Sequence, residues 1–333
     1  MNLDREGVPP LVFAQLLESP VLEPDAVARF RDIMGRERTD VEALLAINAQ
    51  VPLRWITEAL PDLDVDRATT LGLAFAQHVH LTSFGPLSVP LVSAGSAGEI
   101  LELLAYLPLI TPALSARFYS SEHGVSVALN GQTGDRILDS LVVTYCGAVL
   151  LRLLNMLVND APNITLSLGW AAPKGLSADQ SWLAEHLVFD APMSVLHFPV
   201  DAVNDVCRFS DPVAYRLAIG DLQRRLDERR KSTSYSDETR RLMEKFPANC
   251  GSQRIADELS ISTSTLKRRL SEEGVTYRGL RQSIIREYAI LRLLDGSMSA
   301  SEIAKDLGYS DLASFSHAFK HWTGHSPTEF RRR

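Results

Sequence analysis

One short apolar pattern occurs twice near the C-terminal end of the chain and constrains the fold more than any other feature. It reads Ile255-Ala256-x-x-Leu259 in the first copy and Ile303-Ala304-x-x-Leu307 in the second. In each copy the apolar residues occupy positions i, i+1 and i+4, which share one face of a helix. Each copy therefore predicts a short helix that packs against a partner helix.

A second helix follows each copy after a tight polar turn. These helices are predicted over residues 263–273 and 312–323, each preceded by a Ser or Asp that can act as N-cap. Gly274 and Gly324 follow them, and glycine readily adopts the left-handed conformation that ends a helix. The sequence thus predicts two helix-turn-helix units, at residues 252–273 and 300–323.

The outward positions of both second helices are short, polar or basic. Hydroxyl and cationic side chains can reach base edges and phosphates from a helix in the major groove. For one helix alone a solvated face explains the pattern equally well, but two units in tandem favour DNA. The predicted contact residues are Thr263, Ser264, Thr265, Lys267 and Arg268 on the first helix, and Leu312, Ala313, Ser314, Ser316 and His317 on the second.

A longer helix is predicted between the two units, over residues 277–295, from an apolar stripe that includes Leu280, Ile284 and Leu291. At 1.5 Å per residue it spans roughly 28 Å. This length suits two helices that bind neighbouring turns of DNA, which are about 34 Å apart. A last helix is predicted after Ser326-Pro327-Thr328-Glu329, which has the form of a capping box.

The run Ser299-Ala-Ser-Glu-Ile-Ala-Lys-Asp-Leu-Gly-Tyr-Ser-Asp, continued by Phe315 and Phe319, resembles the signature of the AraC/XylS family of bacterial transcription regulators. The resemblance implies that residues 238–333 form an all-α, seven-helix domain that binds double-stranded DNA at promoter half-sites. It also implies a homodimeric activator that contacts RNA polymerase. Leu312 and Ala313 stand where polar side chains would be more useful for base contacts. The first unit is therefore expected to carry most of the sequence discrimination.

The charge distribution agrees with a DNA-binding domain attached to an acidic partner. From Ser232 onward there are 16 Lys and Arg against 13 Asp and Glu, a net charge of +3. The rest of the chain carries −10 of the total of −7. Acidic charge is therefore concentrated in the chain before Ser232, which does not need to contact the phosphates of DNA.

The chain before residue 231 mixes helices and strands and predicts an α+β effector domain over residues 1–230, with residues 231–237 as a polar linker. The strands are predicted at 116–120 and 125–129, which form a hairpin, and at 164–168 and 195–200. The helices are predicted at 11–17, 25–34, 40–50, 66–80, 97–107, 138–158 and 213–229.

This order of elements resembles the N-terminal effector and dimerisation domain of the ornithine-utilisation and VirS-like subgroup of the AraC/XylS family. The resemblance implies a small-molecule effector, and an amino-acid derivative and a fatty acid both suit an apolar pocket. Arg152 interrupts an apolar helix, and it either forms an internal ion pair or reaches solvent, or else holds an effector carboxylate. The alternative function is a constitutive or repressing DNA-binding protein whose first domain only mediates oligomerisation.

The sequence contains few features of an enzyme, a metal site or a membrane protein. No G-x-S-x-G, dinucleotide-binding or H-E-x-x-H motif occurs, and His78 and His80 lack neighbouring ligands, so neither an enzyme nor a cofactor or metal site is predicted. Cys146, Cys207 and Cys250 show no C-x-x-C spacing and are expected to be buried thiols. The most apolar run has 11 residues, fewer than the roughly 20 of a membrane helix, which favours a cytoplasmic protein.

Overall fold

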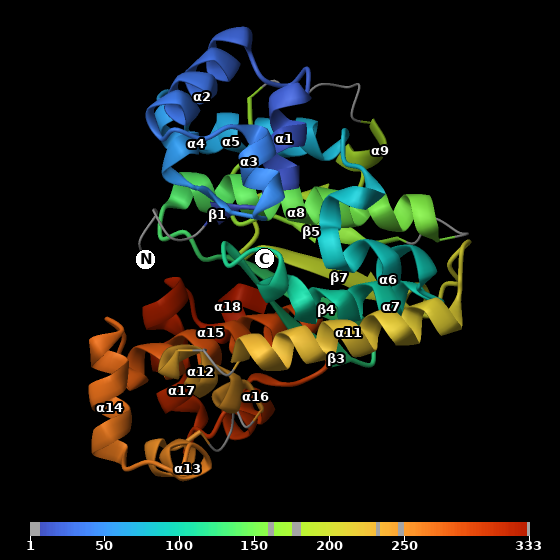
Figure 1. Ribbon diagram of the computed structural model, residues 1–333. Coiled ribbons are helices and arrows are strands. Elements are labelled where there is room, and N and C mark those ends of the chain that lie inside the picture. Colours follow the sequence, from blue (N-terminus) through green and yellow to red (C-terminus); the bar gives the residue numbers. More distant parts are fainter. Residues whose placement is uncertain (1–6, 159–162, 175–180, 231–233, 246–249, 332–333) are drawn as a thin grey trace. The chain divides into compact units, whose positions relative to one another are not determined.

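The chain forms two compact units in the computed structural model (Figure 1). The structure describes residues 7–158, 163–174, 181–230, 234–245 and 250–331. The first unit comprises residues 1–120 and 124–226, and the second comprises residues 121–123 and 227–333. The division at residue 226 falls within helix α11 (Pro212–Arg230).

The first unit begins with a group of helices around an aromatic core. They are α1 (Pro10–Glu18), α2 (Pro24–Arg36), α3 (Val41–Ala46), α4 (Arg54–Ala59) and α5 (Val65–Ala76), with a short antiparallel pair of β1 (Gly7–Val8) and β2 (Val51–Pro52). Phe13 contacts Phe30 edge-on at 5.3 Å and Trp55 at 5.9 Å between ring centroids. Such edge-to-face pairs add stability beyond the buried area alone.

A five-stranded sheet forms the other half of this unit, in the order β3-β4-β7-β5-β6. The strands are β3 (Leu114–Ser121), β4 (Gly124–Gly131), β5 (Thr165–Ser167), β6 (Leu187–Val188) and β7 (Val195–Pro199). The predicted hairpin of β3 and β4 is confirmed, and β7 pairs antiparallel with both β4 and β5. The parallel pairing of the two-residue strand β6 with β5 was not predicted, since so short a strand leaves no periodic pattern.

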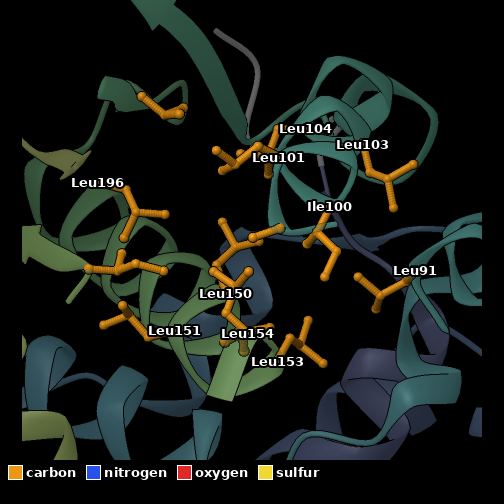
Figure 2. Close-up of a cluster of buried hydrophobic side chains, with 14 of the residues drawn as sticks. Leu91, Ile100, Leu101, Leu103, Leu104, Leu150, Leu151, Leu153, Leu154 and Leu196 are labelled. Atoms are coloured by element: carbon orange, nitrogen blue, oxygen red, sulfur yellow. The ribbon is translucent and has the colours of Figure 1, made fainter. Parts of the chain in front are cut away.

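Helix α8 (Arg136–Leu157) lies between the N-terminal helices and the sheet, as Figure 1 shows. It was predicted as a buried apolar helix at 138–158, and this is confirmed. By length and hydropathy it is the one helix among the described residues that could cross a membrane, and 67% of its most apolar window is buried inside the protein. Figure 2 shows Leu150, Leu151, Leu153 and Leu154 of this helix within the buried apolar cluster.

Two glycines allow α8 to approach its neighbours closely. A Cβ atom at Gly72 of α5 would lie 3.1 Å from the Leu141 carbonyl oxygen and 3.1 Å from the Tyr145 amide nitrogen, both in the backbone of α8. A Cβ atom at Gly147 would lie 2.6 Å from a methyl carbon of Leu166 in β5. The close packing of α8 therefore requires glycine at two positions, Gly72 on the α5 side and Gly147 on the sheet side.

Several predicted helices are shorter than expected. The helix predicted at 40–50 ends at Ala46, followed by Asn48 with a positive φ of 49°, and the one at 66–80 ends at Ala76. The helix predicted at 97–107 is α7 (Ala97–Glu102) followed by the 3₁₀ segment η2 (Leu103–Leu109), because Pro108 cannot donate a helical hydrogen bond. The remaining elements of this unit are η1 (Leu81–Leu87), α6 (Ser88–Ser93), α9 (Ser181–Ala184) and α10 (Val200–Val203).

The second unit contains seven helices within the residues that the structure describes, as the family resemblance implied. They are α12 (Tyr235–Lys245), α13 (Ser252–Glu258), α14 (Thr263–Glu272), α15 (Tyr277–Asp295), α16 (Ala300–Asp306), α17 (Leu312–Thr323) and α18 (Pro327–Arg331). Part of the segment predicted as linker is helical, since residues 235–237 form the first turn of α12. Residues 231–233 of that segment lie outside the described residues.

We expect Gly72→Ala to lower the free energy of unfolding by about 1 to 3 kcal/mol, because the added methyl meets backbone atoms that cannot move aside. Gly220→Ala in α11 is the matched control. No described atom lies within 4 Å of a Cβ at Gly220, so this change should stabilise the protein by up to about 1 kcal/mol. Urea unfolding of both variants measures the difference, and equal stabilities would contradict the close packing of α5 on α8.

Candidate functional site

The first helix-turn-helix is built on the buried face predicted from its apolar triplet. Ile255 and Ala256 of α13 and Leu266 and Leu270 of α14 are all fully buried. Ser262 is the N-cap of α14, and its side chain accepts a hydrogen bond from the Thr265 amide at 3.1 Å. The cap and the apolar seam together fix which face of α14 remains exposed.

The exposed face of α14 carries two cations and a group of hydroxyls. Lys267 and Arg268 are exposed, and Arg268 forms an ion pair with Glu272 one turn along at 2.7 Å. The hydroxyl of Ser262 lies 3.1 Å from that of Ser264 and 2.8 Å from that of Thr265. Of the predicted contact residues, Ser264, Lys267 and Arg268 are exposed, whereas Thr263 and Thr265 are half-buried.

The second helix-turn-helix repeats this construction with an aromatic core. Phe315 and Phe319 of α17 are fully buried, and the ring of Phe319 contacts that of Phe330 edge-on at 5.2 Å. Asp311 is the N-cap of α17 and accepts from the Ser314 amide at 2.7 Å. The left-handed Gly324, with φ of 78°, ends the helix as predicted.

The outward residues of α17 divide into exposed and partly covered positions. Leu312, Ala313, Ser314 and His317 are exposed, and Ser316 is half-buried. The hydroxyl of Ser314 donates to the Asp311 carboxylate at 3.1 Å, so this hydroxyl already has an acceptor. The helix therefore presents mainly apolar and imidazole groups at its first two turns.

Helix α15 connects the two units and occupies the predicted bounds, Tyr277–Asp295. The predicted stripe is buried at Leu280, Ile284 and Leu291, but Leu294 is exposed. Arg292 of α15 pairs with Asp306 of α16, and its guanidinium lies 5.6 Å from the centroid of the Tyr288 ring. This ion pair joins the connecting helix to the second helix-turn-helix.

The first unit contains a cavity of about 150 Å³, and the sequence predicted an apolar pocket there but not the residues that line it. Seven residues of α8 form one of its walls, and the opposite walls come from the N-terminal helices and from η1, α6, α7 and η2. The lining residues Leu91, Ile100, Leu103, Leu104, Leu150 and Leu153 are labelled in Figure 2. The helical spacing of apolar residues indicated that α8 is buried, but it could not show that neighbouring walls leave a space.

The polar groups of the cavity lining are few and neutral. Ser83 donates to Gln15 at 2.6 Å, and the hydroxyl of Thr111 accepts from the Ala113 amide at 3.1 Å. Burial raises the pKa of the Cys146 thiol to about 12. Burial, and to a lesser degree the nearby Cys146, also raises the pKa of Tyr145 far above its ordinary value, so both groups are protonated at neutral pH.

Arg152 is not among the residues that line this cavity. It is half-buried, and its Nε atom has no hydrogen-bond partner among the described residues. The role of Arg152 in binding an effector carboxylate therefore remains a prediction. Cys207 and Cys250 are buried as expected, whereas Cys146 is half-buried because it lines the cavity.

Comparison with known proteins assigns both parts of the chain. Residues 255–333 match the helix-turn-helix domain, and residues 42–205 match the arabinose-binding N-terminal domain of AraC transcription regulators. The chain is 26% identical over 277 residues to the HTH-type transcriptional regulator VqsM of Pseudomonas aeruginosa, a match that covers 78% of this chain and 83% of VqsM.

Two further proteins of Pseudomonas aeruginosa are similar. The ornithine utilization regulator is 23% identical over 273 residues, which cover 78% of each chain. The crystal structure of the transcriptional regulator CdpR aligns with 94% of this chain and 99% of its own, with a TM-score of 0.41 and 21% identity.

Three exposed carboxylates cap the helices of the second helix-turn-helix and α18. Because they act as caps in their charged form, we expect the protein to lose stability in acid. Hydrogen bonds from Ser299 to Glu302, from Ser314 to Asp311 and from Ser326 to Glu329 lower the pKa of each carboxyl. A lowered pKa in the folded state contributes stability that is complete above the unfolded-state pKa of about 4 and is lost as pH falls further.

We therefore expect a Glu302→Gln, Asp311→Asn, Glu329→Gln variant to be less stable than wild type at neutral pH but to lose less stability on acidification. Urea unfolding of the full chain, monitored by the helical circular dichroism signal, is measured at about pH 6 and about pH 3.5. The difference between the two free energies of unfolding gives the stability that wild type and the variant each lose in acid. The Asp25→Asn, Glu58→Gln, Asp221→Asn variant, with the same charge change in the first unit, is the control. Identical acid slopes for wild type and the cap variant would contradict this account.

Proposed function

Because the chain belongs to the AraC family of transcription regulators, we propose that it activates promoters in the cytoplasm in response to a small molecule bound by its first unit. The observation that supports this proposal is the pairing of two helix-turn-helix units, with exposed cations on α14, and a separate unit that contains an apolar cavity. One part has the chemistry to contact DNA and the other has a space for a ligand.

The proposed mechanism is linkage between the two binding events. A ligand that binds one conformation of the first unit more tightly increases the population of that conformation. If that conformation also places α14 and α17 on paired half-sites, or exposes a contact for RNA polymerase, ligand binding raises transcription. The two affinities must then affect each other by the same factor.

Within the DNA complex, we assign base or phosphate contacts to Lys267 and Arg268, which are exposed on α14. The hydroxyls of Thr263, Ser264 and Thr265 are placed for shorter contacts at the start of that helix. For contacts in a second major-groove segment of the DNA, we assign the α17 residues Leu312, Ala313, Ser314, Ser316 and His317.

We also propose that the protein forms a homodimer through its first unit. Val213 and Leu217 lie one turn apart on α11 and are 58% and 72% exposed, whereas Leu222 and Leu226 on the opposite face are buried. Exposed apolar residues that share a helix face are typical of contacts with another protein. A second copy of the chain is the partner that paired half-sites require.

Arg268→Ala should weaken binding to a specific promoter fragment by about 1 to 3 kcal/mol. It should also lower the slope of log binding constant against log salt concentration by about the amount expected for one lost phosphate contact. The loss of its exposed ion pair with Glu272 has little effect on folding, since such pairs contribute about 0.3 to 0.5 kcal/mol. Arg36→Ala removes a similar exposed pair, with Glu58, from α2 of the first unit and should leave affinity unchanged. Equal affinities of all three proteins in fluorescence anisotropy at matched salt would refute the assignment.

Leu217→Glu should convert the dimer to a monomer, because a carboxylate at the centre of an apolar contact would be buried without a partner. Sedimentation velocity of the free protein measures the change. Arg216→Glu, at an exposed neighbouring position, is the control for the added charge. A Leu217→Glu protein with the wild-type sedimentation coefficient would place the dimer contact elsewhere.

A further inference from the structure

The second helices of the two helix-turn-helix units, α14 and α17, correspond residue by residue when they are aligned at their N-caps. Ser262 of α14 and Asp311 of α17 each accept a hydrogen bond from the amide of the third helical residue. The buried apolar residues then fall at the same positions of both helices: Leu266 and Leu270 in α14, Phe315 and Phe319 in α17. The outward positions of the two helices can therefore be compared directly.

The first turn of α17 presents hydrocarbon where α14 has hydroxyls. Leu312 is 42% exposed and Ala313 is exposed beside it, and they occupy the positions of Thr263 and Ser264. In helix-turn-helix proteins, residues near the start of this helix contact base edges in the major groove. An exposed leucine side chain gains free energy when an apolar partner removes it from water. The start of α17 is therefore suited to an apolar group on the DNA.

The polar groups at the start of α17 disfavour a contact with phosphate. The hydroxyls of Ser310 and Ser314 donate to the Asp311 carboxylate at 2.9 and 3.1 Å. The hydrogen bond from the Ser314 amide, together with those from the two hydroxyls, lowers the pKa of the Asp311 carboxyl, which is thus ionised at neutral pH. This negative charge repels phosphate and already occupies one amide of the helix start. The corresponding cap of α14, Ser262, is neutral.

An apolar group is available on only one of the four bases. In the major groove, thymine presents its 5-methyl group, whereas the other three bases present hydrogen-bonding groups alone. We infer that Leu312 selects thymine in one half of the binding site by contact with this methyl group. The inference rests on the proposed function for the position of α17 in the major groove. It adds which base this helix selects and which residue selects it.

The first test uses sites that the purified full-length protein selects from a pool of random double-stranded DNA. We expect wild type to select thymine at a fixed position of the site, and the Leu312→Ser variant to lose that preference. Because Leu312 is exposed, its replacement should leave the unfolding temperature unchanged. Leu294→Ser is the matched control and should keep the preference, since Leu294 is 50% exposed but belongs to the connecting helix α15.

Replacement of the selected thymine by deoxyuridine isolates the methyl group, because uracil keeps every hydrogen-bonding group of thymine. Wild type should bind the deoxyuridine duplex about four-fold more weakly, the effect expected when one methyl group leaves an apolar contact. The Leu312→Ser protein should bind both duplexes equally, because the apolar partner of the methyl group is gone. Fluorescence anisotropy at matched salt measures the four affinities.

Three results would overturn the inference: no thymine preference that depends on Leu312, equal binding of the two duplexes by wild type, or an undiminished methyl effect in Leu312→Ser. A Leu312→Ser change that weakened binding to both duplexes by the same factor would place Leu312 in a different contact. Failure of the proposed function would look different. If no sequence were enriched from the pool, DNA recognition itself would fail, and the inference with it. If thymine were selected but the selected site did not activate transcription, only the proposed activation would fail.

Discussion

The close packing of α8 on both of its sides is the constraint on which the first unit depends. Gly72 lets the backbone of α5 approach α8, and Gly147 lets α8 approach Leu166 of the sheet. Well-packed interiors do not tolerate extra atoms at such contacts without displacing neighbours. The N-terminal helices, α8 and the sheet therefore form consecutive layers whose separation is set by two missing side chains.

The same helix connects this packing to ligand binding. Seven residues of α8, spaced along one face from Leu141 to Leu153, line the cavity, while other faces pack against α5 and the sheet. Tyr145 lies next to the close contact at Gly72, and its buried hydroxyl has no hydrogen-bond partner among the described residues. A ligand in the cavity would contact the helix that both layers of the unit pack against, which gives the proposed linkage a physical route.

The second unit follows a different design, in which helix ends matter more than a large core. Each helix-turn-helix has a small apolar seam, and side-chain caps at Ser262, Ser299 and Asp311 fix where α14, α16 and α17 begin. Arg292 and Asp306 tie the connecting helix to the second helix-turn-helix. Local hydrogen bonds of this kind hold the recognition helices in place while their outer faces remain exposed for a partner.

Nearly all helices of the second unit could be predicted from the amino-acid sequence. The triplets at Ile255 and Ile303, the caps, and Gly296 and Gly324 all act within one or two helical turns, so their consequences could be predicted from neighbouring residues. The same held for the β3-β4 hairpin and for α8, which have strong periodic patterns. Short elements such as β6 and α10 were missed because tertiary contacts decide them, whereas the 3₁₀ segment after α7 was misjudged because the effect of Pro108 on the helix was not taken into account.

The cavity could not be located from the sequence, because it depends on how distant parts of the chain pack together. Tyr145 reads as one more large residue in an apolar helix, and nothing near it in the sequence shows that Phe75 stacks on its ring or that its hydroxyl lacks an acceptor. Arg152 interrupts the apolar run of that helix and was predicted to be a candidate for binding an effector carboxylate, yet the lining contains no charge among the described residues. A cavity is a space left between surfaces that are distant along the chain, so its shape and polarity depend on how those surfaces meet and not on the periodicity of any one of them.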